Sequence, residues 1–234
     1  KACLGPAPCS RAIALWSHSV VIPNLLRNAV KALARQSYLR LNRPFGRMYS
    51  YTAINLLKVS GLATLYQPLY GIRTSLVLGK TPSERGCEDR WELISPQIED
   101  GPGSYLDLGS QLGYFGFRMT EKGHFGIGVE RDRHSCSTAR HLARLNGIDS
   151  TAFLCSEITP HTMAAMPQVD VIFCLSVFHH WVREHGLDHA QAIMRAVTDK
   201  CASQLFFETG QNNEATGSWH EILSFMGNDP KAWI

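Results

Sequence analysis

Residues 104–208 alternate short apolar runs with longer amphipathic stretches, and this alternation restricts the fold more than any other feature of the chain. The run at 169–175 is almost continuously apolar, which is typical of a strand covered on both faces. Such alternation favours an α/β fold with a doubly wound, mostly parallel sheet that binds ligands at the carboxyl ends of its strands. The pattern predicts strands at 104–108, 125–130, 151–155, 169–175 and 205–208, and helices at 114–122, 135–146 and 187–197.

Charge divides the chain into two regions. Residues 1–83 contain 11 Lys or Arg and no Asp or Glu, whereas residues 84–234 contain 12 Lys or Arg and all 20 acidic residues. Such a split indicates two parts with different roles. Turn-forming residues at 79–83 mark the boundary. We therefore predict a basic, mainly helical N-terminal region at 1–83 and a sheet domain at 84–234.

The clearest helix of the basic region spans residues 24–36. Its apolar side chains fall on one stripe, and Arg27, Lys31 and Arg35 fall on another. Basic residues interleaved with aromatic ones continue to residue 51. Residues 24–51 could thus bind RNA, an anionic membrane surface or an anionic substrate. The alternative is a helical cap over the sheet whose outer face is basic.

What the sequence lacks disfavours other classes of protein. No apolar run reaches the roughly 18 residues of a transmembrane helix, and no signal-peptide pattern is present. Residue 1 is Lys1 rather than Met, which suits a numbering that begins inside a longer chain. The seven cysteines include no Cys-x-x-Cys pair, so neither a disulfide framework nor a metal site is expected. We predict a reduced cytoplasmic protein, peripheral to the membrane if the basic region binds lipid.

The turn after the first predicted strand carries the sharpest functional signal. Gly109 and Gly113 permit a tight loop that a ligand can approach closely, and the next helix offers its free N–H groups. Glu130, at the end of the second predicted strand, is placed to accept hydrogen bonds from ribose hydroxyls. The loop lacks the G-x-G-x-x-G fingerprint of nicotinamide cofactors. Asp107 would fit poorly beside a pyrophosphate and well beside a ligand that carries a sulfonium and an ammonium group.

Four segments in this order resemble the motifs of class I S-adenosylmethionine-dependent methyltransferases. They are YLDLGSQLGYF at 105–115, GVE at 128–130, FLCSE at 153–157 and VDVIFCLSVFHH at 169–180. The resemblance covers roughly residues 90–210. Two features depart from the family: Gln111 replaces the middle glycine of the first motif, and the chain ends at Ile234, before the family's last two strands. The chain is therefore either a fragment or a variant without those strands.

The resemblance implies S-adenosylmethionine as the cofactor and assigns residues to it. Asp107, Gly109 and Gly113 would line the methionine side, Glu130 the ribose, and Ser156 or Glu157 the adenine. Glu157 could equally cap a helix. The resemblance also places Ser110, Tyr114 and Leu175 at the cofactor.

His179 and His180 follow the fourth predicted strand, where the methyl group would meet its acceptor. A neutral imidazole is a natural general base for a hydroxyl acceptor, so one of the two is predicted to be catalytic, with His179 slightly favoured. The alternative is one core and one exposed histidine. Trp181 could stack on the substrate or anchor its helix, and Arg85 and Arg90 are predicted to line the substrate entrance.

The favoured interpretation is an S-adenosylmethionine-dependent methyltransferase that modifies oxygen on an anionic small-molecule or glycan-type substrate. No Asn/Asp-Pro-Pro-Tyr motif stands at the fourth predicted strand, which disfavours methylation of the amino groups of adenine or glutamine. No Pro-Cys nucleophile occurs in the predicted sheet domain, which disfavours methylation of cytosine C5. An RNA methyltransferase that docks through the basic region is one alternative. A catalytically silent S-adenosylmethionine-binding module is another. The sequence determines neither the acceptor nor the oligomeric state.

Overall fold

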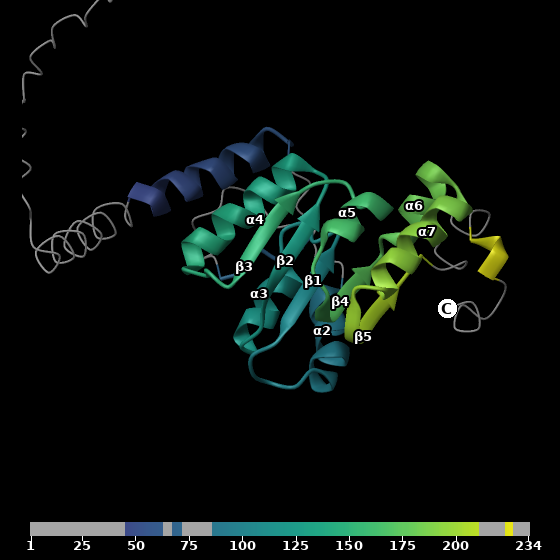
Figure 1. Cartoon of the computed structure of the whole chain (residues 1–234). Helices are drawn as coiled ribbons and strands as arrows, with labels where there is room; N and C mark the ends of the chain where they lie inside the picture. The colour runs from purple at the N-terminus through teal and green to yellow at the C-terminus, as the bar shows by residue number, and fades with distance from the viewer. Residues whose placement is uncertain (1–44, 63–66, 72–85, 211–222, 227–234) are drawn as a thin grey trace, which may run out of the picture. The chain divides into compact units, whose positions relative to one another are not determined.

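The computed structural model describes residues 45–62, 67–71, 86–210 and 223–226 (Figure 1). By its internal contacts the chain divides into residues 1–43 and residues 44–234, and only the second unit contains described residues. The predicted helix at 24–36, with Arg27, Lys31 and Arg35, lies outside the described residues. So do Arg85 and the predicted boundary at residue 83, which stays a prediction.

Five parallel strands form one sheet in the order β3-β2-β1-β4-β5. Their bounds are β1 Ser104–Leu108, β2 Phe125–Glu130, β3 Thr151–Cys155, β4 Val169–Leu175 and β5 Cys201–Glu208. The predicted α/β fold is confirmed, and β5 begins four residues before its predicted start. Because the order reverses between β1 and β4, a crevice opens between their carboxyl ends, where open parallel sheets bind ligands.

Helices cover both faces of the sheet (Figure 1). On one face Tyr105 and Phe173 pack with α2 (Cys87–Ile94) and α3 (Tyr114–Glu121), and Phe153 packs with α3 and α4 (Arg133–Asn146). On the other face Leu106 and Ile172 pack with α5 (Pro160–Ala165), α6 (Phe178–His185) and α7 (Leu187–Thr198). Neighbouring residues of β4 thus point into opposite cores, which explains its continuous apolar run. Cys174 is fully buried in the same core as Leu106 and Ile172.

Helix α4 begins and ends at recognisable capping residues. Asp132 accepts a hydrogen bond from the N–H of Ser135 at the start of α4, and Gly147 ends this helix with a left-handed φ of 67°. The helices predicted at 114–122, 135–146 and 187–197 are confirmed as α3, α4 and α7, and α2, α5 and α6 are shorter helices whose bounds were not predicted. The bounds are α2 Cys87–Ile94, α3 Tyr114–Glu121, α4 Arg133–Asn146, α5 Pro160–Ala165, α6 Phe178–His185 and α7 Leu187–Thr198, with 3-10 turns η2 Ser95–Gln97 and η3 Ser224–Met226.

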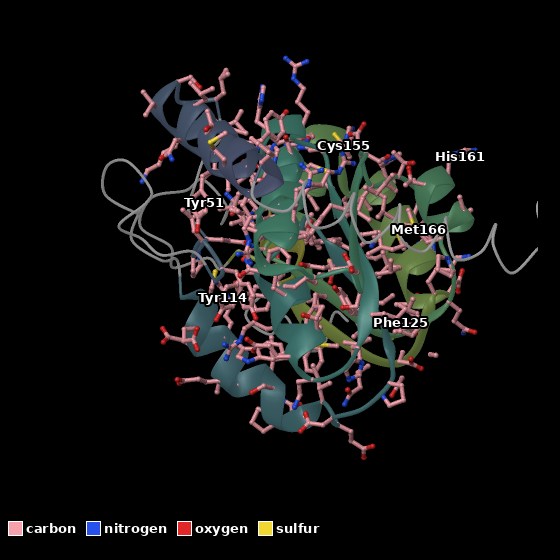
Figure 2. The ribbon with its side chains drawn as sticks, turned by 90° about the vertical axis from the view of Figure 1, so that its left-hand side faces the viewer. Tyr51, Tyr114, Phe125, Cys155, His161 and Met166 are labelled. Atoms are coloured by element: carbon pink, nitrogen blue, oxygen red, sulfur yellow. The ribbon has the colours of Figure 1, made fainter. Side chains whose placement is uncertain are left out.

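Part of the basic region packs directly on the sheet domain. Residues 45–59 form a helix beside α4 (Figure 2, where Tyr51 marks this helix). Ile54 of this helix packs against side chains of α4 and has only 1% of its surface exposed. The Oγ of Ser50 lies 3.1 Å from Nδ1 of His141 on α4. Further along, Tyr70 stacks on Phe117 of α3. None of the described helices has the length and apolar character needed to cross a membrane.

Candidate functional site

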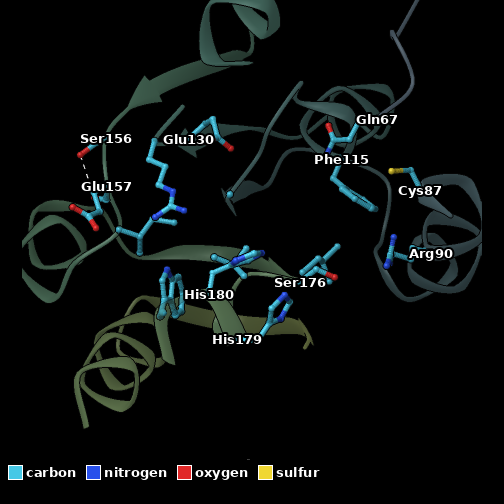
Figure 3. A pocket seen from close by; sticks show the side chains of 16 residues that line it. Gln67, Cys87, Arg90, Phe115, Glu130, Ser156, Glu157, Ser176, His179 and His180 are labelled. Carbon is cyan, nitrogen blue, oxygen red and sulfur yellow. Dashed lines mark hydrogen bonds between the residues drawn. The ribbon is translucent and has the colours of Figure 1, made fainter. Parts of the chain in front are cut away.

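A cavity of about 440 Å³ lies at the carboxyl ends of the strands, in the crevice between β1 and β4. Its volume is in the usual range for a small-molecule site. Figure 3 shows Glu130 and Glu157 on one side and Arg90 on the opposite side, with His179 and His180 between them. The predicted site residues that line the cavity are Arg90, Gly109, Glu130, Ser156, Glu157, Leu175, His179, His180 and Trp181.

The other predicted cofactor residues in the described part of the chain do not line the cavity. All four are buried in the loop at 109–113 or in the elements that flank it: Asp107 in β1, Ser110 and Gly113 in the loop, and Tyr114 at the start of α3. The hydroxyl of Tyr114 donates a hydrogen bond to Glu88 on α2, so this side chain joins α3 to α2. These four residues are placed to shape the loop from beneath.

The loop at 109–113 needs backbone conformations that glycine adopts easily. Gly109 and Gly113 have φ values of +74° and +83°. A Cβ on Gly109 would lie 2.6 Å from Val177, and one on Gly113 would lie 2.4 Å from the ring of Phe153. Gln111, which stands where the family pattern has glycine, also has a positive φ of 48°. The backbone of this loop is therefore left-handed at position 111 although the residue there is not glycine.

Glu130 is held in place by two backbone N–H groups. Its Oε2 accepts from the N–H of Gln111 at 2.9 Å, and its Oε1 accepts from the N–H of Asp132 at 2.7 Å. Burial raises the pKa of this carboxyl, and the two N–H groups oppose that rise. Each carboxylate oxygen has a second lone pair, so Glu130 can accept further hydrogen bonds from a diol in the cavity.

Asp107 lies under the loop as a buried carboxyl with little compensation. Its Oδ2 has no hydrogen-bond partner among the described residues, and neither has the Oγ of Ser110. Burial, and then the charge of Glu130, raise the pKa of Asp107 from 3.8 to about 7. A cation bound above the loop would stabilise the ionised carboxylate. The pair of unsatisfied groups thus fits a positively charged ligand.

Ion pairs tie the Glu130 side of the cavity to α6. Arg131 makes two hydrogen bonds to Glu184 of α6, and this lowers the pKa of Glu184 to about 2. Oε1 of Glu157 lies 3.1 Å from Nε2 of His185 on the same helix. Thr159, not Glu157, caps α5. Glu157 is therefore available to the cavity rather than to a helix end.

On the opposite side, Arg90 is fixed by a carboxylate that the sequence analysis did not identify. Nε and Nη2 of Arg90 donate to Glu208 at 2.5 and 2.7 Å. The hydroxyl of Ser176 donates to the same carboxylate at 2.6 Å. Burial acts to raise the pKa of Glu208, but the bonds from Arg90 and Ser176 outweigh it and lower the pKa. Arg90, which the sequence predicted to line the substrate entrance, thus lines the cavity as one half of an ion pair.

Both histidines line the cavity, and their partners fix where the ring protons lie. The N–H of Gly210 donates to Nδ1 of His179 at 3.0 Å, and Nη2 of Arg183 donates to Nδ1 of His180 at 3.0 Å. A backbone amide and a guanidinium can only donate, so each neutral ring carries its proton on Nε2. Burial lowers the pKa of both, that of His179 to about 4. Both rings are therefore neutral at pH 7.

Trp181 anchors α6 and also lines the cavity. Its ring lines the cavity, yet only 5% of its surface is exposed and it packs edge-on against Phe178 at 6.3 Å between ring centres. Leu175 lines the cavity from the end of β4. Contact with a substrate at Trp181 stays a prediction.

Gln67 contributes to the site from within the basic region. Its Oε1 accepts from the N–H groups of Leu112 and Tyr114, at 3.1 and 3.2 Å, and its side chain lines the cavity. The carbonyl thereby satisfies the N–H of Leu112 in the loop and the first N–H of α3, at Tyr114. No local pattern around residue 67 signals this role, because the contact joins residues 45 and 47 positions apart.

Within the part of the chain that the structure describes, no group of three or more His, Cys, Asp or Glu side chains could hold a metal ion. The described cysteines are free thiols: Cys87, Cys136, Cys155, Cys174 and Cys201.

Comparison with known proteins supports the fold. No protein-family model matches the chain. The chain is 28% identical over 149 residues to the O-antigen chain terminator bifunctional methyltransferase/kinase WbdD of Escherichia coli, a match that covers 60% of this chain and 20% of that protein. The chain thus spans about a fifth of the length of the curated relatives it matches.

Solved structures of WbdD have a similar architecture. A complex of WbdD with a kinase inhibitor gives a TM-score of 0.62 at 26% identity, covering 77% of this chain and 41% of that one. A second WbdD structure gives a TM-score of 0.58 at 28% identity, covering 69% of this chain and 32% of that one. These likenesses, together with the sheet order, confirm the predicted class I methyltransferase fold.

Proposed function

We propose that this chain, which has the class I S-adenosylmethionine-dependent methyltransferase fold, transfers a methyl group from S-adenosylmethionine to an oxygen atom of its substrate. The observation that carries the proposal is the cavity at the reversal of the sheet. There Glu130 presents an oriented carboxylate, and the buried carboxyl of Asp107 has an unsatisfied oxygen beneath the loop.

The residues present suit the proposed cofactor. Glu130 would accept hydrogen bonds from the ribose, and Ser156, Glu157 and Arg131 would surround the adenine. Asp107 would stabilise positive charge at the methionine end through the loop. When bound, S-adenosylmethionine supplies an electrophilic methyl group on a sulfonium. The chain's own groups then need mainly to hold the acceptor oxygen in line with that methyl group.

The opposite side of the cavity suits an acceptor oxygen that already bears negative charge. With their Nδ1 atoms occupied, His179 and His180 offer N–H donors rather than basic lone pairs. Arg90 adds positive charge nearby, although Glu208 balances it. An anionic oxygen needs donors and no general base, whereas a neutral hydroxyl needs a base. We therefore favour an anionic acceptor, and propose that the histidines orient it.

The name of the relative supports a glycan-type acceptor. WbdD is an O-antigen chain terminator, and an O-antigen is a glycan. A glycan carrying an anionic group would combine this chemistry with the donors described above. We propose this substrate class for the present chain.

Calorimetry with S-adenosylmethionine tests the cofactor. Glu130→Gln replaces one carboxylate oxygen by an amide N–H₂ that faces a backbone donor. We expect an affinity loss of roughly tenfold to over a hundredfold, because hydrogen bonds to a charged group contribute about 1.5–3 kcal/mol. Glu99→Gln, at an exposed position, should bind normally. Equal affinity in folded Glu130→Gln and Glu99→Gln would contradict the proposed ribose contact.

Turnover with anionic glycans tests the transfer step. His179→Gln keeps a side-chain N–H donor, whereas His179→Ala removes it, so the glutamine variant should retain more activity if the ring donates. If the ring accepts a proton, both variants should lose activity equally, by about 10²–10⁴-fold. Cofactor binding without transfer to any acceptor would favour a silent binding module. Transfer only to RNA would favour the RNA methyltransferase alternative.

A further inference from the structure

The helix at 45–59 has two apolar sides, and among the described residues only one of them has packing partners. Ile54 is buried against α4, and Ser50 is buried beside His141. The other side exposes large apolar side chains that form what we call the outer stripe. The outer stripe consists of Phe45, Met48, Tyr49, Leu56 and Val59, which are 61–70% exposed, and Leu62 just beyond the helix, which is 54% exposed.

Helical geometry places the outer stripe directly opposite the buried side. Residues 45, 48, 49, 56 and 59 share one side of the helix, while Ser50 and Ile54 lie across the helix axis. Tyr49 lies at the edge of the stripe, where its ring touches His141 edge-on, at 5.4 Å between ring centres. Contacts to one histidine of α4 thus fix the rotation of the helix, and the fold holds the stripe outward.

A stripe of this size is unusual on a soluble surface. Single exposed apolar side chains are common and need no explanation. Five exposed apolar side chains on one side of a four-turn helix, with only Thr52 between them, form a cluster, and such clusters mark contacts with proteins or membranes. The contrast with the buried side shows that core packing does not account for these residues.

The charge of the helix, and of the sequence region 1–83 to which it belongs, indicates the kind of surface that the outer stripe meets. The helix carries Arg47 and Lys58 and no acidic residue, and no Asp or Glu occurs anywhere in residues 1–83. RNA would require a face lined by Lys and Arg, and the stripe is not such a face. Pairing of two copies through the stripe would bring two strongly basic regions together against their repulsion. An anionic lipid surface satisfies both the apolar stripe and the positive charge.

We propose that the outer stripe docks this chain on the surface of an anionic bilayer. The helix at 45–59 lies in the plane of the interface, with the stripe in the boundary between headgroups and acyl chains. The basic side chains of residues 1–83 attract the anionic headgroups. This proposal stands independently of the proposed methyl transfer.

Vesicle flotation of the full chain tests the proposal. Vesicles of phosphatidylcholine with roughly 30% phosphatidylglycerol should carry the protein, and pure phosphatidylcholine should carry far less of it. Phe45→Ser with Leu56→Ser should weaken binding to the anionic vesicles by roughly tenfold or more, because two inserted apolar side chains are lost. The matched control is Phe125→Ser with Leu93→Ser, which changes the same residue types at 58% and 74% exposed positions elsewhere.

All four substituted side chains are exposed, so both double variants should fold. Circular dichroism checks that they do. Equal binding of the wild-type protein and the stripe variant to anionic vesicles would overturn the proposal. So would a wild-type dimer that the stripe variant converts to a monomer, because the stripe would then cover a second copy. RNA binding that weakens only in the stripe variant would equally assign the stripe to another partner.

Discussion

Asp107 offers a direct test of how the loop is built, through the substitution Asp107→Asn. The change keeps the shape of the side chain and removes its charge. In the wild-type protein burial and the charge of Glu130 raise the pKa of Asp107 from 3.8 to about 7. The folded state therefore prefers the protonated form, and ionisation above that pKa destabilises the fold. The asparagine variant cannot ionise and escapes this cost.

The size of the effect follows from the pKa shift. Each unit corresponds to about 1.4 kcal/mol, so ionised Asp107 destabilises the folded state by up to about 4 kcal/mol. The stabilising contribution of this group is complete below the ordinary pKa of 3.8 and is lost as pH rises toward 7. The difference in unfolding free energy between Asp107→Asn and wild type should grow by about 2–3 kcal/mol from about pH 5 to about pH 8, in favour of the variant.

Urea denaturation at the two pH values measures this difference. Subtracting wild type from variant cancels the titration of the other groups, and Asp149→Asn at an exposed position is the matched control. If the variant and the wild-type protein lose stability in parallel between the two pH values, Asp107 is not the buried, undercompensated carboxyl described above. S-adenosylmethionine should also raise the melting temperature of the variant less than that of wild type, because the variant lacks the charge that complements the ligand.

Three further predictions concern the loop and the acceptor side. Gln67→Ala should lower the unfolding free energy by about 1–3 kcal/mol and weaken cofactor affinity, because two buried N–H groups lose their acceptor; Gln67→Glu keeps the acceptor oxygen and should restore most of the affinity in calorimetry. Gly113→Ala should destabilise the protein by about 2–4 kcal/mol in thermal denaturation, through its positive φ and the clash with Phe153, while Gly147→Ala, with a positive φ and open space, should cost about 1–2 kcal/mol. The pH profile of kcat should show no limb from His179 near 6.5, because burial lowers its pKa to about 4; activity that falls as pH drops through 6.5 in the wild type and not in His179→Gln would contradict this.

The sequence by itself determined the order of strands and helices and the place of the ligand loop. Apolar runs and their periodicity are local properties, so the four strands at 104–108, 125–130, 151–155 and 169–175 could be located with their bounds as the structure has them. Gly109 and Gly113 were identified because a left-handed turn leaves its mark on residue type. Three cavity residues on the proposed cofactor side could also be predicted, because each stands at or just after the end of a strand: Gly109, Glu130 and Glu157.

Only the tertiary structure decided how the site is supported and charged. The contacts of Gln67 with the loop, of Glu208 with Arg90, and of Gly210 with His179 join residues 31 to 118 positions apart, and no short pattern records them. Burial also shifts pKa values in a way that residue type does not reveal. From the sequence alone, Asp107 would be expected to behave as an ordinary carboxylate and His179 as an ordinary base. Desolvation in the folded chain keeps both near their neutral forms, because a low-dielectric interior disfavours charge that no partner compensates.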